Sequence, residues 1–110
     1  MNYTQAIAYL NSFINFESLP DDAFRTTEND LIRFEKLLIE LGYPQSKYPI
    51  IHIAGTKGKG STAAILESIL IDNGYKVGLF TSPHLITVRE RIRIDRLMIS
   101  QESFAGIIEQ

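Results

Sequence analysis

The chain has 110 residues, of which 45% are hydrophobic and 22% charged, and its formal net charge at pH 7 is −2. These values are typical of one small globular domain, and they provide no bulk attraction to nucleic acid or anionic lipid. The absence of cysteine excludes disulfides, thiolate metal sites and cysteine nucleophiles. The apolar runs are too short to span a bilayer and the N-terminus lacks the basic flank of a secretory signal, so we expect a cytoplasmic protein.

Two amphipathic helices are predicted in the first half of the sequence. Apolar residues recur at helical spacing over residues 3–15. A polar segment with a proline and adjacent acids follows, which favours a loop. Thr27, with Asp30 three positions later, forms the pattern of a helix N-cap, and the apolar residues after it predict a second helix that ends at Gly42.

The middle of the sequence has the order strand, glycine bend, helix, strand. The run IIHIA, residues 50–54, is compact, β-branched and apolar, so it predicts a buried strand with His52 packed in the core. A helix is predicted from Gly60 to Asn73, and KVGLFT, residues 76–81, predicts a second buried strand. Such βαβ units are nearly always parallel. We therefore expect an α/β fold, a P-loop-type three-layer nucleotide-binding core with a parallel sheet.

Two parallel strands alone do not make a stable sheet, because parallel sheets need cover on both faces and further neighbouring strands. We therefore expect residues 1–110 to be the N-terminal part of a nucleotide-binding domain in a longer protein. In this interpretation the remaining strands and any later domain lie outside the chain.

The last part of the sequence predicts a hairpin and a helix. ERIRI, residues 90–94, alternates polar and apolar residues, and LMIS, residues 97–100, returns after the turn DR. Ser100 then has the position of an N-cap for a final helix that begins with QESFAGIIEQ.

The bend AGTKGKGST, residues 54–62, carries the chemistry that indicates a function. Backbone N–H groups of a glycine bend at a helix N-terminus converge on one concavity, and the helix adds partial positive charge, so the bend suits a phosphate group. Lys59 adds a mobile charge, and Ser61 and Thr62 supply hydroxyls for a magnesium ion or a phosphate oxygen. The pattern G-x-x-x-x-G-K-[ST] is not strictly met, because isoleucine occupies the first glycine position and a glycine follows the lysine.

Four stretches, AGTKGKGST, LESIL, GYKVGLFTSPHL and ERIRI, resemble the N-terminal part of folylpolyglutamate synthase and its bifunctional relative dihydrofolate synthase, of the Mur ligase superfamily. The combination of GTKGKGS with TSPHL is specific to this group. The resemblance implies an ADP-forming ligase in which a folate or dihydropteroate carboxylate takes the γ-phosphoryl group of ATP, and the amine of glutamate then displaces phosphate. It leaves open which of the two glutamate additions the enzyme performs. Because the family's later magnesium ligands and C-terminal domain lie beyond this chain, we expect the chain alone to be inactive.

The resemblance also implies roles for individual residues, with ATP and Mg²⁺ as cofactors and small molecules as the only partners of a monomeric full-length enzyme. Lys59 is the implied catalytic residue, since it would counter the charge of the transferring phosphoryl group, and Ser61 and Ser82 are the implied magnesium ligands. Lys57 departs from the family, where asparagine is more usual. The implied nucleotide-binding residues are Gly55, Thr56, Lys57, Gly58, Lys59, Gly60, Ser61 and Thr62. The implied substrate-binding residues are Thr26, Thr27, Glu28, Asn29 and His84.

Two other classes of protein compete with this interpretation. A small-molecule kinase or GTPase-like enzyme would share the phosphate-binding bend but would not require TSPHL or ERIRI. A nucleic-acid-binding module would use the arginine-rich run RERIRIDR, residues 89–96, to contact phosphates. The negative net charge and the lack of interleaved aromatic residues favour a solvated strand face with cross-strand ion pairs instead.

Overall fold

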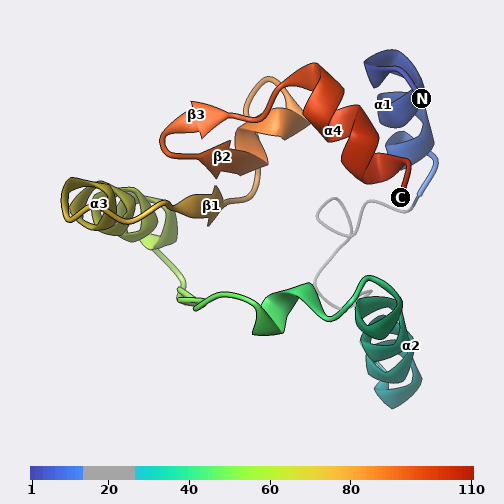
Figure 1. The fold of residues 1–110 in the computed structure, drawn as a ribbon, viewed down its shortest axis with the longest axis horizontal. Helices are drawn as coiled ribbons and strands as arrows, with labels where there is room; N and C mark the ends of the chain where they lie inside the picture. Colours follow the sequence, from blue (N-terminus) through green and yellow to red (C-terminus); the bar gives the residue numbers. More distant parts are fainter. Residues whose placement is uncertain (14–26) are drawn as a thin grey trace. The chain divides into compact units, whose positions relative to one another are not determined.

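The computed structural model describes residues 1–13 and 27–110, and the chain divides into two compact units (Figure 1). One unit comprises Met1–Phe13 with Ile53–Gln110, and the other comprises Ile14–His52. The loop predicted after the first helix, and that helix's last residues, lie outside the described residues. Among the described residues, no helix is both long enough and apolar enough to cross a bilayer.

The described part of the second unit consists mainly of α2, Glu28–Glu40. Its start confirms the predicted cap: the backbone N–H of Asp30 donates to the Thr27 hydroxyl at 3.3 Å, and the Asp30 carboxylate accepts from the backbone N–H of Thr27 at 3.0 Å. The hydrogen bonds that the Asp30 carboxylate accepts from Thr27, first from the backbone N–H and then from the hydroxyl, lower the pKa of the Asp30 carboxyl. The helix ends before Gly42, whose φ of 79° is left-handed.

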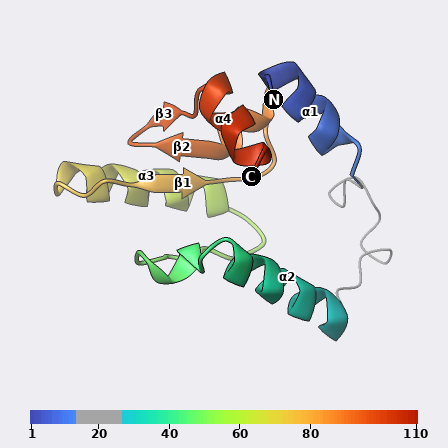
Figure 2. The same cartoon turned by 45° about the vertical axis from the view of Figure 1, so that its right-hand side comes forward.

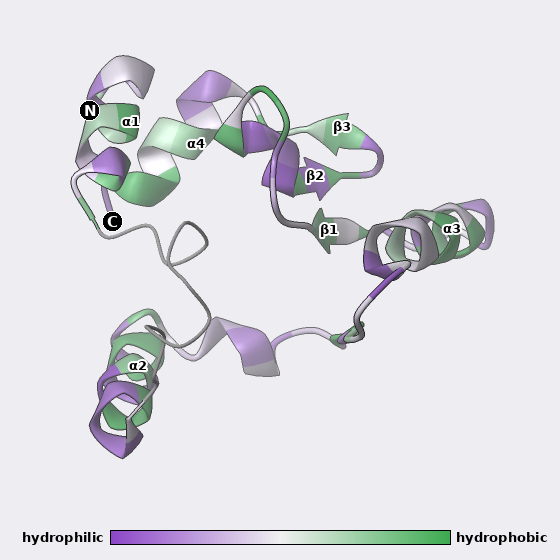
Figure 3. Ribbon diagram, turned by 180° about the vertical axis from the view of Figure 1, so that it is seen from behind, coloured by the Kyte–Doolittle hydropathy of each residue, from purple (hydrophilic) through white to green (hydrophobic). Residues whose placement is uncertain are grey.

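Polar and apolar residues alternate around α2 (Figure 3), and most of its large apolar side chains are exposed. They are Leu31, Ile32, Phe34, Leu37 and Ile39. A short 3-10 helix, η3, follows at Pro44–Ser46. This unit therefore buries little apolar surface among its described residues.

The core of the first unit lies between α1, Tyr3–Asn11, and α4, Gln101–Ile108, which pack side by side (Figure 2). Ala6 of α1 and Phe104 and Ala105 of α4 are buried, and the ring of Tyr3 meets that of Phe104 edge to face at 5.8 Å. The predicted cap of α4 is confirmed, because the Ser100 hydroxyl accepts the backbone N–H of Ser103 at 3.0 Å. The two ends of the chain thus form the largest apolar contact of this unit.

The sheet of this unit is antiparallel, with strands in the order β1 (Gly78–Phe80), β2 (Ile92–Ile94), β3 (Leu97–Met98). Leu79 pairs with Arg93 in the register of β1 and β2. The predicted hairpin of β2 and β3 is confirmed, and its turn residues Asp95 and Arg96 both have positive φ, 46° and 70°. A two-residue turn with this backbone matches the twist of the flanking strands.

The prediction of a strand at residues 50–54 is wrong: the described backbone is irregular there, and His52 is exposed instead of packed in a core. The helix after the bend is confirmed as α3, Lys59–Asp72, but the strand that follows it, β1, pairs only with β2 among the described residues. A run of β-branched residues becomes a buried strand only beside a partner strand, and no described segment provides one. The α/β class is therefore observed, whereas the parallel three-layer core is not.

The arginines of the hairpin form their ion pairs with α3 and not across the strands, contrary to the expectation from the sequence. Arg93 of β2 contacts Glu67 of α3 at 3.1 Å, and Arg96 in the turn contacts Asp72 at 3.2 Å. The Glu67 side chain is only 3% exposed, whereas that of Asp72 is 71% exposed. These contacts tie the hairpin to the helix that follows the glycine bend.

Candidate phosphate-binding site

The glycine bend leads directly into α3, as the sequence predicted. Gly58 is the N-cap residue, with φ of 77° and ψ of 6°, and its carbonyl accepts the first helical hydrogen bond, from Thr62 N–H at 2.9 Å. A Cβ atom at Gly58 would meet no other atom within 4 Å, so glycine is favoured there by its backbone conformation and not by crowding. The first N–H groups of a helix have no intrahelical partner, and those of Lys59, Gly60 and Ser61 are therefore available to an anion.

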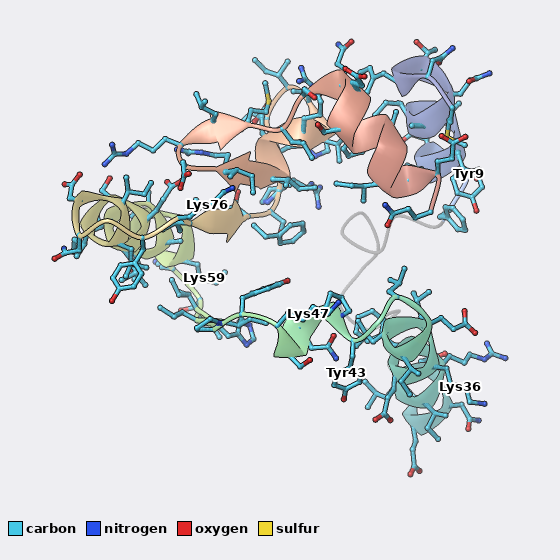
Figure 4. The ribbon with its side chains drawn as sticks, in the orientation of Figure 1. Tyr9, Lys36, Tyr43, Lys47, Lys59 and Lys76 are labelled. Carbon is cyan, nitrogen blue, oxygen red and sulfur yellow. The ribbon has the colours of Figure 1, made fainter. Side chains whose placement is uncertain are left out.

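Lys59 lies at the first turn of α3 and folds back over the bend (Figure 4). Its ammonium group donates a hydrogen bond to the carbonyl oxygen of Gly55 at 2.6 Å. Both residues are exposed, as are all the other residues of the bend that the sequence assigned to nucleotide binding. The ammonium group therefore lies at the Gly55 carbonyl, in an accessible position on the bend that leads into α3, where full positive charge adds to the partial charge of the helix N-terminus.

A second loop, residues 82–87, follows β1 and is here called the serine loop. Ser82 at its start is exposed, which leaves its hydroxyl accessible. His84 is half-buried, and its Nδ1 accepts a hydrogen bond from Nε of Arg91 at 2.8 Å. This histidine is thus held by an arginine of the following segment and is not merely solvated.

Glu90 holds the other end of the serine loop, a role that was not predicted from the sequence. It lies in the short 3-10 helix η4, Val88–Arg91, and its carboxylate accepts the backbone N–H groups of Leu85, Ile86 and Thr87. These hydrogen bonds, of which that from Leu85 is the largest cause, lower the pKa of the Glu90 carboxyl. The spacing of Thr87 and Glu90 is that of a capping box, which was the available signal in the sequence.

The remaining predicted substrate residues, 26–29, belong to the other compact unit. Thr26 lies outside the described residues. Thr27, Glu28 and Asn29 open α2 in the other compact unit, and the Thr27 hydroxyl is engaged in the helix cap.

The two predicted magnesium ligands, Ser61 and Ser82, are both exposed. Hydroxyl oxygens are hard donors of the kind that Mg²⁺ accepts beside phosphate oxygens and water, so their chemistry fits the ion. Within residues 1–13 and 27–110, no group of three or more acidic or histidine side chains forms a ready cation site. Among the described residues, the two hydroxyls are therefore the predicted donors, and no complete cage of protein ligands is present.

The class of protein that these features define is an α/β protein with a glycine bend at a helix N-terminus and a serine loop after the next strand. No model of a protein family matches the chain. The chain is 45% identical over 105 residues to folylpolyglutamate synthase of Arabidopsis thaliana, a match of 96% of this chain and 18% of that one. It is also 45% identical over 78 residues to the dihydrofolate synthase/folylpolyglutamate synthase of Bacillus subtilis, covering 71% of this chain and 18% of the relative.

Solved structures agree with the relatives found by sequence. The apo form of Lactobacillus casei folylpolyglutamate synthase matches with a TM-score of 0.83 and 36% identity, over 99% of this chain and 24% of that one. The enzyme of Thermotoga maritima matches with a TM-score of 0.78 and 40% identity, over 97% of this chain and 22% of that one. The chain is therefore related in sequence and fold to the folylpolyglutamate synthases, as its motifs indicated. It spans about a fifth of the length of these relatives.

Proposed function

We propose that this chain is the N-terminal, ATP-phosphate-binding part of an ADP-forming ligase that joins glutamate to a folate or dihydropteroate carboxylate. The observation that carries the proposal is the left-handed Gly58 at the start of α3, with the Lys59 ammonium group held across the bend on the Gly55 carbonyl. The relationship to folylpolyglutamate synthases supports the substrate class, because one matching structure is a complex of that enzyme with AMPPCP and folate. That structure matches with a TM-score of 0.83 and 36% identity, over 99% of this chain and 24% of that one.

A carboxylate is a poor acylating agent, so an amide ligase first needs to convert it into a form with a good leaving group. Transfer of the γ-phosphoryl group of ATP to the carboxylate oxygen gives an acyl phosphate and ADP, and attack by the glutamate amine then releases phosphate. In such transfers the protein mainly positions the groups and neutralises charge. Here the bend from Gly55 to Thr62 holds the phosphates by its backbone N–H groups, while Lys59 exchanges its contact with the Gly55 carbonyl for the terminal phosphate.

Ser61 and Ser82 would hold the magnesium ion, which neutralises phosphate charge when it is bound. Residues from Thr26 to Asn29 and His84 are the proposed contacts for the acid substrate, the last on the serine loop. Because the chain is about a fifth the length of its relatives, we expect it to bind nucleotide but to require the rest of such a ligase for turnover. In that ligase, comparison of dihydropteroate with folate as the acid substrate identifies which glutamate addition is catalysed.

The test is calorimetric titration of the chain with Mg·AMPPCP. We expect saturable binding that Lys59→Ala weakens about tenfold or more, since a charge-assisted contact to phosphate is lost. The matched control is Lys76→Ala, which removes an exposed lysine just before β1 and should leave the affinity unchanged (Figure 4). Equal weakening by the two variants would show that only bulk charge matters, and it would contradict the proposed site.

A further inference from the structure

One carboxylate fixes half of the serine loop. Oε2 of Glu90 accepts the backbone N–H of Leu85 at 3.0 Å, and Oε1 accepts those of Ile86 at 2.8 Å and Thr87 at 2.7 Å. An ionised carboxylate accepts about four hydrogen bonds, so this loop uses most of the capacity of the side chain. Three consecutive peptide units are thereby held by a group that lies outside the loop.

The loop is not held by burial of its own side chains. Leu85 and Ile86 are 92% and 91% exposed, the highest values among the exposed large apolar residues. Apolar side chains so fully exposed contribute almost nothing to the stability of the loop, because the stabilisation depends on the area removed from water. Polar contacts therefore determine its shape, and Glu90 supplies more of them than any other described residue.

Two further contacts join the loop to the rest of its unit. The Thr87 hydroxyl lies 3.0 Å from the Tyr3 hydroxyl of α1, and His84 accepts from Arg91. Between the loop and the hairpin lies an open pocket of about 350 Å³, which Pro83, Leu85 and Glu90 line together with hairpin residues. A change in the loop backbone therefore alters one wall of this pocket.

We propose that Glu90 is a positioning residue for the acid substrate: its carboxylate holds the serine loop in the shape that receives the folate- or pteroate-type molecule. This inference rests on the proposed function, because it assigns that substrate to the serine loop. Glu90 acts through the loop backbone and contacts no reacting atom. Leu85 and Ile86 then present a fixed apolar surface to the substrate. Because the loop is already ordered, binding loses less conformational entropy.

The side-chain chemistry predicts a graded series of variants. Glu90→Ala removes all three acceptor contacts. Glu90→Gln keeps the length but leaves one acceptor oxygen in place of two, and its amide nitrogen cannot accept a backbone N–H. Glu102→Gln, at an exposed acid in the first turn of α4, is the matched control for loss of a carboxylate.

The first measurement is amide hydrogen exchange of the 110-residue chain, followed residue by residue. We expect Glu90→Ala to raise the exchange rates of Leu85, Ile86 and Thr87 about tenfold or more, with a smaller rise for Glu90→Gln. The amides of Asp95 and Ile99, which donate to Val77 and Ile92, report whether the sheet is intact. If the loop amides of Glu90→Ala exchange as slowly as in the unchanged chain while the sheet amides stay protected, the proposal is overturned.

The second measurement uses the longer ligase that the proposed function requires. We expect Glu90→Gln to raise KM for the acid substrate about tenfold while KM for ATP changes less than about twofold, a split that general destabilisation would not produce. Normal turnover with an unchanged KM for the acid overturns the role of Glu90 and leaves the proposed function standing. Failure of the unchanged ligase to bind nucleotide refutes the proposed function itself, and the assignment of the acid substrate to the serine loop with it.

Discussion

The glycine bend and the serine loop differ in whether their backbone N–H groups have hydrogen-bond partners. The glycine bend before α3 leaves its backbone N–H groups accessible, and its Lys59 side chain donates to the carbonyl oxygen of Gly55 in the same bend. The serine loop after β1 gives three of its N–H groups to the single carboxylate of Glu90. A loop that receives an anion needs free donors, whereas a loop that presents side chains needs its donors satisfied. Backbone N–H groups are thus left open for the proposed anion in the glycine bend, whereas in the serine loop they hold the backbone conformation.

The largest effect is expected from the conformation of the bend. Gly58→Ala places a Cβ in a left-handed backbone, which costs about 1–2 kcal/mol of stability and distorts the amides that are proposed to bind phosphate. Gly106→Ala, in the helical backbone of α4, is the control, because a Cβ at either glycine meets open space. We expect it to stabilise the chain by about 0.5–1 kcal/mol. Urea unfolding with titration by Mg·AMPPCP measures both; equal changes would refute the conformational argument.

The next effect concerns the link from α3 to the hairpin. Glu67→Gln leaves Arg93 without its ionic partner at a position where the glutamate side chain is 3% exposed. Because the Arg93 side chain is 35% exposed and can be hydrated, breaking this pair should cost about 1–1.5 kcal/mol in the free energy of unfolding. The control is Asp72→Asn, which breaks the exposed pair with Arg96 and should cost no more than about 0.5 kcal/mol. Chemical denaturation of both variants gives the comparison, and a smaller loss for Glu67→Gln contradicts it.

A pH titration sharpens the contrast between the loops. The pKa of the Glu90 carboxyl is lowered by the N–H groups of the serine loop, so the ionised form stabilises the folded loop. That contribution is complete above the ordinary glutamate pKa of about 4.3 and is lost as pH falls through the lowered folded value. We expect the exchange protection of Leu85 to Thr87 to decline over this acid range, relative to the sheet amides. In Glu90→Gln that decline should vanish, and its persistence would assign the protection to another group.

The smallest effect is expected where the serine loop meets the core. Tyr3→Phe removes the hydroxyl that lies 3.0 Å from the Thr87 hydroxyl but keeps the ring against Phe104. Loss of one such hydrogen bond should cost about 0.5–1.5 kcal/mol. Tyr9→Phe, at a half-exposed tyrosine of α1, should change nothing measurable. Thermal unfolding of the two variants decides the point, and identical midpoints would show that the hydroxyl pair contributes no stability.

The sequence predicted well those features whose causes lie within a few residues. The caps at Thr27 and Ser100 and the two-residue turn of the hairpin involve contacts between residues at most three positions apart. The glycine bend and its helix are equally local, because left-handed backbone and the start of α3 depend on Gly58 and its neighbours. The family resemblance also rested on such short motifs, and the relatives confirmed it.

Tertiary structure decided which residues far apart in the sequence are in contact, and the predictions that failed depended on such contacts. Residues 50–54 have the composition of a strand, but a strand needs a partner, and β1 pairs with β2 instead. The arginines of the hairpin reach α3 because the fold brings Glu67 and Asp72 to them, which no spacing in the chain encodes. Sequence alone determined the local backbone at the candidate site, where steric and hydrogen-bonding rules act over one turn. Pairing of strands and of charges depended on contacts between segments far apart in the chain, which only the folded molecule specifies.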